Sequence, residues 1–502
     1  LITQRLIDFD DMLALCVRTL LNYPEVLAEY RRSAEYILVD EYQDTNPVQF
    51  AYLKILAGSK GNLCVVGDDD QSIYAFRGAE ISNILDFEKH FENVKEIKLV
   101  QNYRSTEKIL TLANNLISRN LSRRGKNLTA ERSDSGEINF RNFKDEKEEA
   151  DFLAEKAWDW SRAGRNLSDM AVLYRTNAQS RNFEIALKRL NIPYKVVGGV
   201  GFYQRREIKD ILSYLKVLDN PFDEINFIRA VKTPSRGVGE QLIEKIKAYS
   251  AAEGCDFLTA ASQLALTASK KQAMGVNLFL NIILNINSAA SITEKVAAAI
   301  RLTKYQEYLF SSEEKQEAQE REENVLELIN AAAAFEEQLP ESTLADFLAV
   351  SSLTTSVDEK AANGAVPLMT VHSAKGLEFA SVYLAGLEEG IFPIGSLRDG
   401  DFELEEERRL CYVAITRAKT YLTVSYTKSR MVHGSRRNMN PSRFLAEMRK
   451  QTLEKGAPIF HETFGEGLII EVGGETPFPI AEVFFKKGGR KRIRADFLRV
   501  RQ

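Results

Sequence analysis

The chain has 502 residues, of which 44% are hydrophobic and 27% charged, and its formal net charge is −4. This length exceeds what one hydrophobic core supports, so three or four domains are expected. The negative net charge argues against a protein that coats nucleic acid without sequence specificity. No apolar run approaches the roughly 20 residues of a membrane span, and the four scattered cysteines form no C-x-x-C pair, which disfavours a zinc or iron–sulfur site and predicts reduced thiols in the cytosol.

The first part of the chain alternates short apolar runs with helical patterns. It opens at Leu1 inside a helical pattern and without a methionine, which predicts a fragment of a longer protein. Three apolar runs end in polar residues, and these runs are Tyr36–Val39, Leu63–Val66 and Ile97–Val100. Continuous apolar strands with acids just past their ends predict a parallel sheet that is buried on both faces and carries its chemistry at the strand tips.

A change of pattern divides the rest of the chain. A helix is predicted to begin at Asp145, and strand patterns follow at Ala171–Tyr174 and Tyr194–Val197. From about 204 to 353 long amphipathic helices replace the strands, and strand patterns then return at Leu368–Val371, Val382–Leu384 and Leu422–Val424. This predicts one α/β domain interrupted by a helical insertion. Phe464–Val500 has short strands and glycine turns, which predict a small β-barrel.

Basic residues gather in two stretches. No acidic residue lies between Glu407 and Glu447, where many arginines and lysines accumulate, and a second basic run extends from Lys486 to Arg494. Two interpretations stay open for each stretch, a nucleic-acid surface or an ordinary solvated face.

Two strand ends carry residues suited to nucleotide chemistry. After the first run, one of the acids Asp40 and Glu41 could hold Mg²⁺ while the other deprotonates an attacking water, although acids end many strands. After the second run, Gln71 could hydrogen-bond a γ-phosphate and water without adding charge. Tyr74 and Phe76 flank Arg77 and could stack on single-stranded bases; the alternative is a loop whose aromatic side chains turn inward.

The third stretch, Gln101–Thr106, precedes a helix. Tyr103 could stack on a base and Arg104 could reach a phosphate. On local evidence the favoured role of the stretch is to cap the helix through Ser105 or Thr106.

Five stretches together resemble motifs II to VI of the UvrD/PcrA/Rep family of superfamily 1 DNA helicases, in order and in spacing. They are D-E-Y-Q-D-T-N at 40–46, G-D-x-D-Q-S-I-Y-x-F-R-G-A at 67–79, Q-N-Y-R-S-T at 101–106, M-T-V-H-S-A-K-G-L-E-F at 369–379 and E-E-E-R-R-L-C-Y-V-A-I-T-R-A at 405–418. The resemblance covers essentially the whole chain.

The resemblance implies a role for each matching residue. In the ATP site, Asp40 binds Mg²⁺, Glu41 is the general base, Gln71 senses the γ-phosphate, Tyr103 stacks on adenine, Glu378 contacts the ribose, and Arg104 and Arg417 are arginine fingers. The single-strand track consists of Tyr74, Phe76, Arg77 and His372. A loop with Arg236, Gly237 and Gly239 resembles one that lies against duplex backbone.

The implied fold is α/β, with tandem RecA-like P-loop NTPase lobes. The first lobe is truncated (residues 1–93), and the second is split (94–203 and 364–447) by an all-helical 2B insertion (204–363). A Tudor/SH3-like β-barrel closes the chain (455–502).

The implied function is an ATP- and Mg²⁺-dependent 3′-to-5′ translocase and helicase in DNA repair or replication, in the bacterial cytosol or nucleoid. Its implied partners are single-stranded and duplex DNA, RNA polymerase through the tail, and mismatch- or excision-repair proteins. The sequence departs from the family in three ways: these residues contain neither G-x-x-x-x-G-K-[ST] nor the glutamine motif, Phe76 replaces a tryptophan, and His433 replaces an aromatic residue.

Two rival functions are weighed against the helicase. If the chain is complete, it is a non-hydrolysing protein that binds DNA and RNA polymerase. If it is a fragment of a helicase, the fragment itself is expected to be inactive because it lacks the P-loop. A helicase–nuclease of the AddA/RecB kind is disfavoured, because no nuclease-sized domain follows Arg499 and no cysteine cluster is present.

Overall fold

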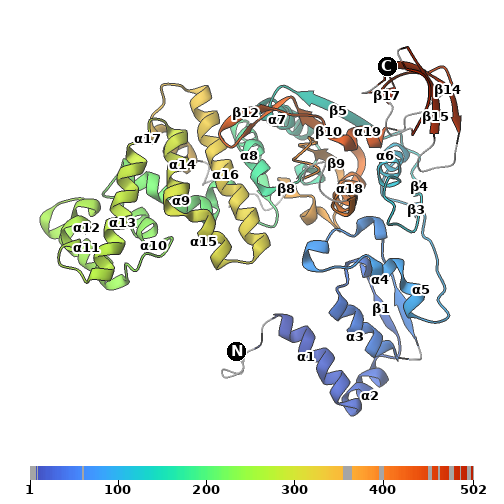
Figure 1. Cartoon of the computed structure of the whole chain (residues 1–502), viewed down its shortest axis with the longest axis horizontal. Coiled ribbons are helices and arrows are strands. Elements are labelled where there is room, and N and C mark those ends of the chain that lie inside the picture. Colours follow the sequence, from blue (N-terminus) through green and yellow to red (C-terminus); the bar gives the residue numbers. More distant parts are fainter. Residues whose placement is uncertain are drawn as a thin grey trace.

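The computed structural model describes residues 7, 9–58, 61–353, 364–394, 401–449, 455–461, 464–473, 480–486, 488–494 and 499–500. Figure 1 shows an N-terminal unit, a central sheet with its helices, a block of helices beside that sheet and a small sheet near the C-terminus. Within the described ranges, no helix has the length and apolar character needed to cross a membrane.

The N-terminal unit is built on a two-stranded parallel sheet. β1 (Ile37–Val39) pairs with β2 (Leu63–Val65), and α3 (Pro47–Ala57) connects them. The other helices of this unit are α1 (Phe9–Asn22), α2 (Pro24–Ser33), α4 (Ser82–Leu85) and α5 (Phe87–His90). Because parallel strands end at the same edge of a sheet, the residues that follow β1 and β2 lie next to each other.

Two predictions about this unit are wrong. Leu38, in the middle of β1, is 79% exposed and Cys64 on β2 is exposed, so the sheet is covered on one face only in the described part of the chain. The run Ile97–Val100 forms no strand, because no described strand pairs with it. The short strand β3 (Gln101–Asn102) begins directly after this run.

The parallel sheet predicted for the α/β fold is confirmed in the central unit. Its six strands have the order β5-β10-β9-β6-β8-β7, and all neighbours are parallel. The strands are β5 (Glu137–Phe143), β6 (Met170–Tyr174), β7 (Tyr194–Val196), β8 (Val366–Thr370), β9 (Phe379–Leu384) and β10 (Ala418–Thr427). Strands from before and after the helical block are interleaved in this sheet, so the two segments fold as one unit. The mostly polar edge strand β5 has no counterpart in the sequence-based prediction.

Helices and short elements surround the central sheet. The helices are α6 (Glu107–Ile117), α7 (Glu146–Arg162), α8 (Ser180–Arg189), α18 (Asp401–Thr416) and α19 (Arg443–Met448). Asp145 caps α7 as predicted, because its carboxylate accepts the backbone N–H groups of Lys147 and Glu148. The short strand β4 (Thr129–Ala130) pairs with β3, and β11 (Ser429–Val432) forms a hairpin with β12 (Ser435–Asn438).

Residues 206–353 are helical, as their amphipathic pattern predicts. Their helices are α9 (Arg206–Asp219), α10 (Glu224–Lys232), α11 (Glu240–Glu253), α12 (Phe257–Ala265), α13 (Lys270–Asn287), α14 (Ile292–Thr303), α15 (Tyr305–Ser312), α16 (Lys315–Gln338) and α17 (Leu344–Leu353). They share one hydrophobic core, centred on aromatic side chains such as Tyr214, Phe227 and Phe279. In Figure 1 this block extends to one side of the central sheet, and α16 lies nearest to it.

The C-terminal part is a five-stranded antiparallel sheet with the order β16-β15-β14-β13-β17. Its strands are β13 (Pro458–His461), β14 (Gly465–Gly473), β15 (Ile480–Phe485), β16 (Gly489–Arg494) and β17 (Arg499–Val500). Among the described residues the pairing stops at β16 and β17, so closure into a barrel stays a prediction.

The basic stretch between Glu407 and Glu447 has much of its positive charge paired within the protein, whereas Lys428 and Arg437 are exposed. Most of its arginines are paired with acids from distant parts of the chain: Arg408 with Glu447, Arg430 with Glu149 and Glu388, Arg436 with Glu337, and Arg443 with Glu389. Arg430 and both of its partners are buried. These arginines cross-link the central unit, because buried cations need acids to offset their desolvation.

Candidate nucleotide and single-strand sites

The tips of β1 and β2 bring the first two motifs together. Asp40 and Glu41 directly follow β1, and Gly67 and Asp68 follow β2. Glu41 has a φ of 50°, in the left-handed region that non-glycine residues rarely adopt. Backbone strain of this kind persists where the surrounding structure enforces it, and it is concentrated at functional sites.

Gln43, to which the sequence pattern assigns no role, joins the two tips. Its side-chain amide donates to Glu41 Oε2 at 2.5 Å, and its Oε1 accepts the backbone N–H of Asp68 at 2.9 Å. A Cβ on Gly67 would lie 2.6 Å from Gln43 Oε1, so only glycine leaves room for this contact. Gln43 therefore fixes the carboxylate of Glu41 relative to the second motif.

Gln71 and Arg417 meet between the N-terminal and central units. Arg417 Nη2 donates to Gln71 Oε1 at 3.1 Å, and Gln71 Nε2 donates to Asp68 Oδ2 at 2.7 Å. The Arg417 side chain is 2% exposed, and its other nitrogens donate to the carbonyls of Val413 and Leu377. Burial, and next the positive charge of Arg104, lower the pKa of Arg417 to about 10, so it keeps its charge at neutral pH.

A cleft of about 760 Å³ opens beside these residues. It is lined by Gln101, Asn102, Tyr103, Arg104, Arg132, Glu378 and Lys419. Tyr103 is 70% exposed, so one face of its ring is free to stack. Glu378 Oε2 accepts Arg104 Nε at 2.6 Å, and Lys419 Nζ lies 2.6 Å from Glu378 Oε1. Lys419 first and Arg104 second hold the pKa of Glu378 below its usual value.

These residues fit one side of an ATP site. The cleft has the size of a small-ligand pocket and offers an aromatic face, a carboxylate suited to a ribose hydroxyl, and cations suited to phosphates. Asp40 is exposed and uses one oxygen to accept the backbone N–H of Glu41, which leaves its other oxygen available. One carboxylate together with nucleotide phosphates is a common ligand set for Mg²⁺.

The predicted capping of α6 by Ser105 or Thr106 is wrong. Thr106 occupies the N-cap position but its side chain makes no capping hydrogen bond, and Ser105 Oγ donates to the carbonyl of Ala418 on β10 at 2.6 Å. Asn102 Oδ1 instead accepts the backbone N–H groups of Arg104 and Ser105. The turn that presents Tyr103 and Arg104 is thus held by Asn102 and attached to the central sheet.

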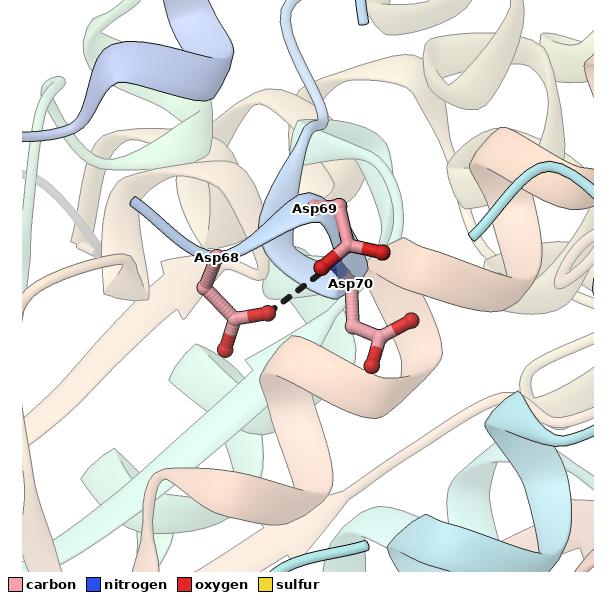
Figure 2. Close-up of side chains that lie close together, drawn as sticks. All are labelled: Asp68, Asp69 and Asp70. Atoms are coloured by element: carbon pink, nitrogen blue, oxygen red, sulfur yellow. Dashed lines mark hydrogen bonds between the residues drawn. The ribbon is translucent and has the colours of Figure 1, made fainter. Parts of the chain in front are cut away.

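Three adjacent carboxylates, Asp68, Asp69 and Asp70, lie close together (Figure 2). A segment of the central unit already neutralises them. Arg123 binds Asp70 through two hydrogen bonds of 2.9 and 2.7 Å, Lys126 pairs with Asp68, and the backbone N–H of Arg124 donates to Asp69 at 2.8 Å. The cluster is an electrostatic contact between the two units, and no metal is needed to explain it.

The four residues predicted to line a single-strand track come together from both units. Phe76 is 43% exposed, and its ring centroid lies 5.8 Å from that of Tyr74 and 5.5 Å from that of His372. The Arg77 guanidinium lies over both the Tyr74 and Phe76 rings. Burial, then the charges of Arg175 and Arg77, lower the pKa of His372 to about 3, so it is neutral. The aromatic side chains therefore do not all turn inward, and Phe76 offers a surface to bases.

The remaining predicted DNA residues lie in the loop between α10 and α11. Gly237 and Gly239 are exposed, and Gly237 has a φ of 77°. The guanidinium of Arg236 points into its own helical block, where it donates to the carbonyls of Ala230 and Pro234 and lies over the Tyr214 ring. In this conformation the loop exposes the backbone of Gly237 and Gly239, whereas the positive charge of Arg236 is directed into the helical block.

Comparison with known proteins identifies two family models that match this chain. Residues 1–92 match the family model for the UvrD/REP helicase N-terminal domain, and residues 97–429 match that for the UvrD-like helicase C-terminal domain. A protein of Bacillus subtilis strain 168, named ATP-dependent DNA helicase PcrA, is 44% identical over 467 residues, which is 90% of this chain and 63% of that protein.

Staphylococcal proteins with the same name are also similar. The protein from Staphylococcus epidermidis RP62A is 37% identical over 536 residues, which is 98% of this chain and 73% of that protein. The protein from Staphylococcus aureus MRSA252 is 37% identical over 538 residues, which is 98% of this chain and 74% of that protein. The chain therefore spans 63–74% of the length of these relatives.

Proposed function

Because the chain belongs to the UvrD/REP family of helicases, we propose that it carries the motor of an ATP-dependent DNA helicase that acts in DNA repair or replication. The hydrogen bond between Gln71 and Arg417 is the main structural support. Gln71 follows β2, the strand beside the β1 tip that carries Glu41, and Arg417 is a buried cation of the other unit. The nucleotide-sized cleft opens beside this hydrogen bond. The relatives are named ATP-dependent DNA helicase PcrA, which points to the same activity.

Each residue of the site has a chemical task in this proposal. Bound Mg²⁺–ATP would supply the phosphoryl group that is transferred to water. Asp40 would hold the Mg²⁺, and Glu41, oriented by Gln43, would take the proton from the attacking water. Tyr103 and Glu378 orient the base and the ribose, and Gln71, Arg104 and Arg417 stabilise the developing negative charge.

The motor action follows from the division of these groups between two units. Glu41 and Gln71 belong to one unit, and Arg104 and Arg417 belong to the other, so nucleotide favours their closure and hydrolysis favours their separation. Single-stranded DNA lies against Phe76, Tyr74, Arg77 and His372, and each cycle moves it past these side chains. The proposed direction of movement along the single strand is 3′ to 5′. Protein molecules that move along an oligonucleotide should therefore accumulate at its 5′ end, where a dye attached to that end reports their arrival.

Partners and location are proposed from the same family membership. Duplex DNA lies against the loop with Gly237 and Gly239, and the C-terminal sheet contacts RNA polymerase through a surface that includes exposed Arg490 and Arg492. Repair proteins are further proposed partners, and the proposed location is the bacterial cytoplasm.

The test is ATP hydrolysis by the protein expressed from its complete reading frame, with and without single-stranded DNA. We expect turnover that rises when a single strand is added, and unwinding of a duplex with a 3′ tail. Single-strand binding without any ATP turnover would overturn the motor and leave a DNA-binding protein, the alternative raised by the absence of G-x-x-x-x-G-K-[ST] from residues 1–502.

Phe76→Ala is expected to weaken single-strand binding by about 1–3 kcal/mol, because it removes a half-exposed ring on which a base can stack. Fluorescence anisotropy with a labelled oligonucleotide measures the change. Phe310→Ala is the matched control, since Phe310 is 45% exposed but lies on α15 in the helical block. Unchanged affinity in Phe76→Ala would remove Phe76 from the track.

A further inference from the structure

The side-chain amide of Gln71 is held between an acid and a cation. Gln71 Nε2 donates to Asp68 Oδ2 at 2.7 Å, and Gln71 Oε1 accepts Arg417 Nη2 at 3.1 Å. An ionised carboxylate only accepts hydrogen bonds, and a guanidinium only donates them. The reversed amide would place its oxygen against the carboxylate and its N–H groups against the guanidinium. Asp68 and Arg417 together therefore allow Gln71 one of its two amide orientations.

A lysine of the central unit holds the Asp68 carboxylate in turn. Lys126 lies between α6 and β4, and its ammonium pairs with Asp68 Oδ1, the oxygen that does not bind Gln71. The backbone N–H of Asp70 donates to the same Oδ1 at 2.9 Å (Figure 2). Among the described groups that bind this carboxylate, only Lys126 belongs to the central unit. Both oxygens of Asp68 are engaged, so the carboxylate cannot rotate without breaking a contact.

Lys126 is fixed in place and keeps its charge. Arg123 binds the Asp70 carboxylate through two hydrogen bonds, and it also donates to the backbone carbonyl of Lys126 at 3.0 Å. The Lys126 side chain is 16% exposed. Burial lowers the pKa of Lys126, but the charges of Asp68 and Asp70 outweigh burial and raise this pKa above its usual value. While the two units are in contact, the segment from Arg123 to Lys126 therefore holds a cation against Asp68.

We propose that Lys126 is a positioning residue for the γ-phosphate sensor, because it acts through Asp68 to set the orientation of the Gln71 amide. In this orientation one Nε2 hydrogen of Gln71 binds Asp68, and no described residue accepts the other, which can donate to a phosphate oxygen. When the units separate, Lys126 withdraws and the Asp68 carboxylate is free to rotate. Gln71 is then no longer held in the orientation that senses phosphate. This inference rests on the function proposed above.

The test is a double-mutant cycle on kcat for ATP turnover with single-stranded DNA present, in the protein expressed from its complete reading frame. Lys126→Met removes the cation and should lower kcat by about 10-fold to 100-fold, since misplacing a catalytic group by about 1 Å costs up to about 10²-fold. Gln71→Ala removes the sensor itself. If Lys126 acts through Gln71, the double variant should be no slower than Gln71→Ala alone. An unchanged kcat in Lys126→Met, or single effects that multiply in the double variant, would overturn the inference.

Three further variants separate positioning from charge and stability. Lys126→Arg should recover part of kcat because it restores a cation beside Asp68. Asp69→Asn removes a charge of the same cluster that lies 3.6 Å from Lys126 but makes no hydrogen bond with Gln71 among the described contacts, so kcat should stay within a few-fold of wild type. A loss as large as that of Lys126→Met would mean that the charge of the cluster, and not the Gln71 orientation, matters. Lys428→Met, which removes an exposed charge of the central unit, should leave kcat unchanged.

Nucleotide binding and folding are measured beside kcat. The affinity of Lys126→Met for a fluorescent ADP analogue should stay close to wild type, because ADP has no γ-phosphate and Lys126 does not line the cleft. If Lys126→Met melts below the assay temperature, Asp68→Asn replaces it, since it keeps the side-chain shape and removes the charge that Lys126 binds. It should lower kcat and also show no further loss with Gln71→Ala. Absence of DNA-stimulated turnover in the wild type would overturn the proposed function instead.

Discussion

Glu41→Gln is expected to lower DNA-stimulated ATP turnover by about 10²–10⁴-fold, the usual contribution of a general base. Glutamine has nearly the same shape, and its side-chain oxygen can still accept the 2.5 Å hydrogen bond from Gln43. The left-handed backbone at this position is kept as well, because the change is confined to the end of the side chain. Only the ability to take a proton from water is lost, so ATP binding should remain.

Steady-state turnover and the binding of a fluorescent ATP analogue measure the two effects separately. Glu35→Gln is the matched control, because Glu35 is an exposed acid just before the other end of β1. The control should hydrolyse ATP at the wild-type rate. Turnover by Glu41→Gln within a few-fold of wild type would mean that another group is the base, and loss of nucleotide binding would mean that Glu41 has a structural role.

The sequence predicts most of the central fold, because its strands are apolar, short and bounded by polar residues. β6 is buried at every position and coincides with such a run, and the N-terminus of α7 follows from the capping pattern of Asp145 and Glu148. The prediction fails at Ile97–Val100, which has the composition of a strand. A strand forms only where a neighbour completes its hydrogen bonds, and local composition does not reveal whether that neighbour is present.

The sequence identifies the candidate site through its motifs but does not reveal how the motifs are connected. Gln43 lies inside a recognised motif, yet its role depends on contacts with residues 2 and 25 positions away. Lys126 lies outside every motif, and its pair with Asp68 shows only in three dimensions. The basic stretch after Glu407 illustrates the same limit, since much of its charge is neutralised by acids such as Glu149 that are remote in sequence.

Arg417→Lys is expected to lower DNA-stimulated ATP turnover by about 10³-fold, the lower end of the range for arginine fingers. The guanidinium of Arg417 binds Gln71, Leu377 and Val413 through three different nitrogens. A lysine has a single ammonium group and cannot reach all three at once, so the charge is no longer fixed beside Gln71. Arg408→Lys is the matched control, because Arg408 is a nearly buried arginine on the preceding helix α18 that pairs with Glu447, away from Gln71.

The pH dependence of Arg417→Lys tests why an arginine occupies this position. Burial and the nearby Arg104 lower the pKa of Arg417 to about 10, which still leaves the wild-type side chain charged throughout the neutral range. A lysine begins from a lower ordinary pKa of about 10.4, so the same burial and repulsion bring its pKa toward the assay range. Since a cation loses its proton as pH rises, residual turnover of Arg417→Lys, relative to wild type, should fall between pH 6.5 and pH 8.5. A constant ratio to wild type over that range would show that the lysine stays charged, and the loss of activity would then come from geometry alone.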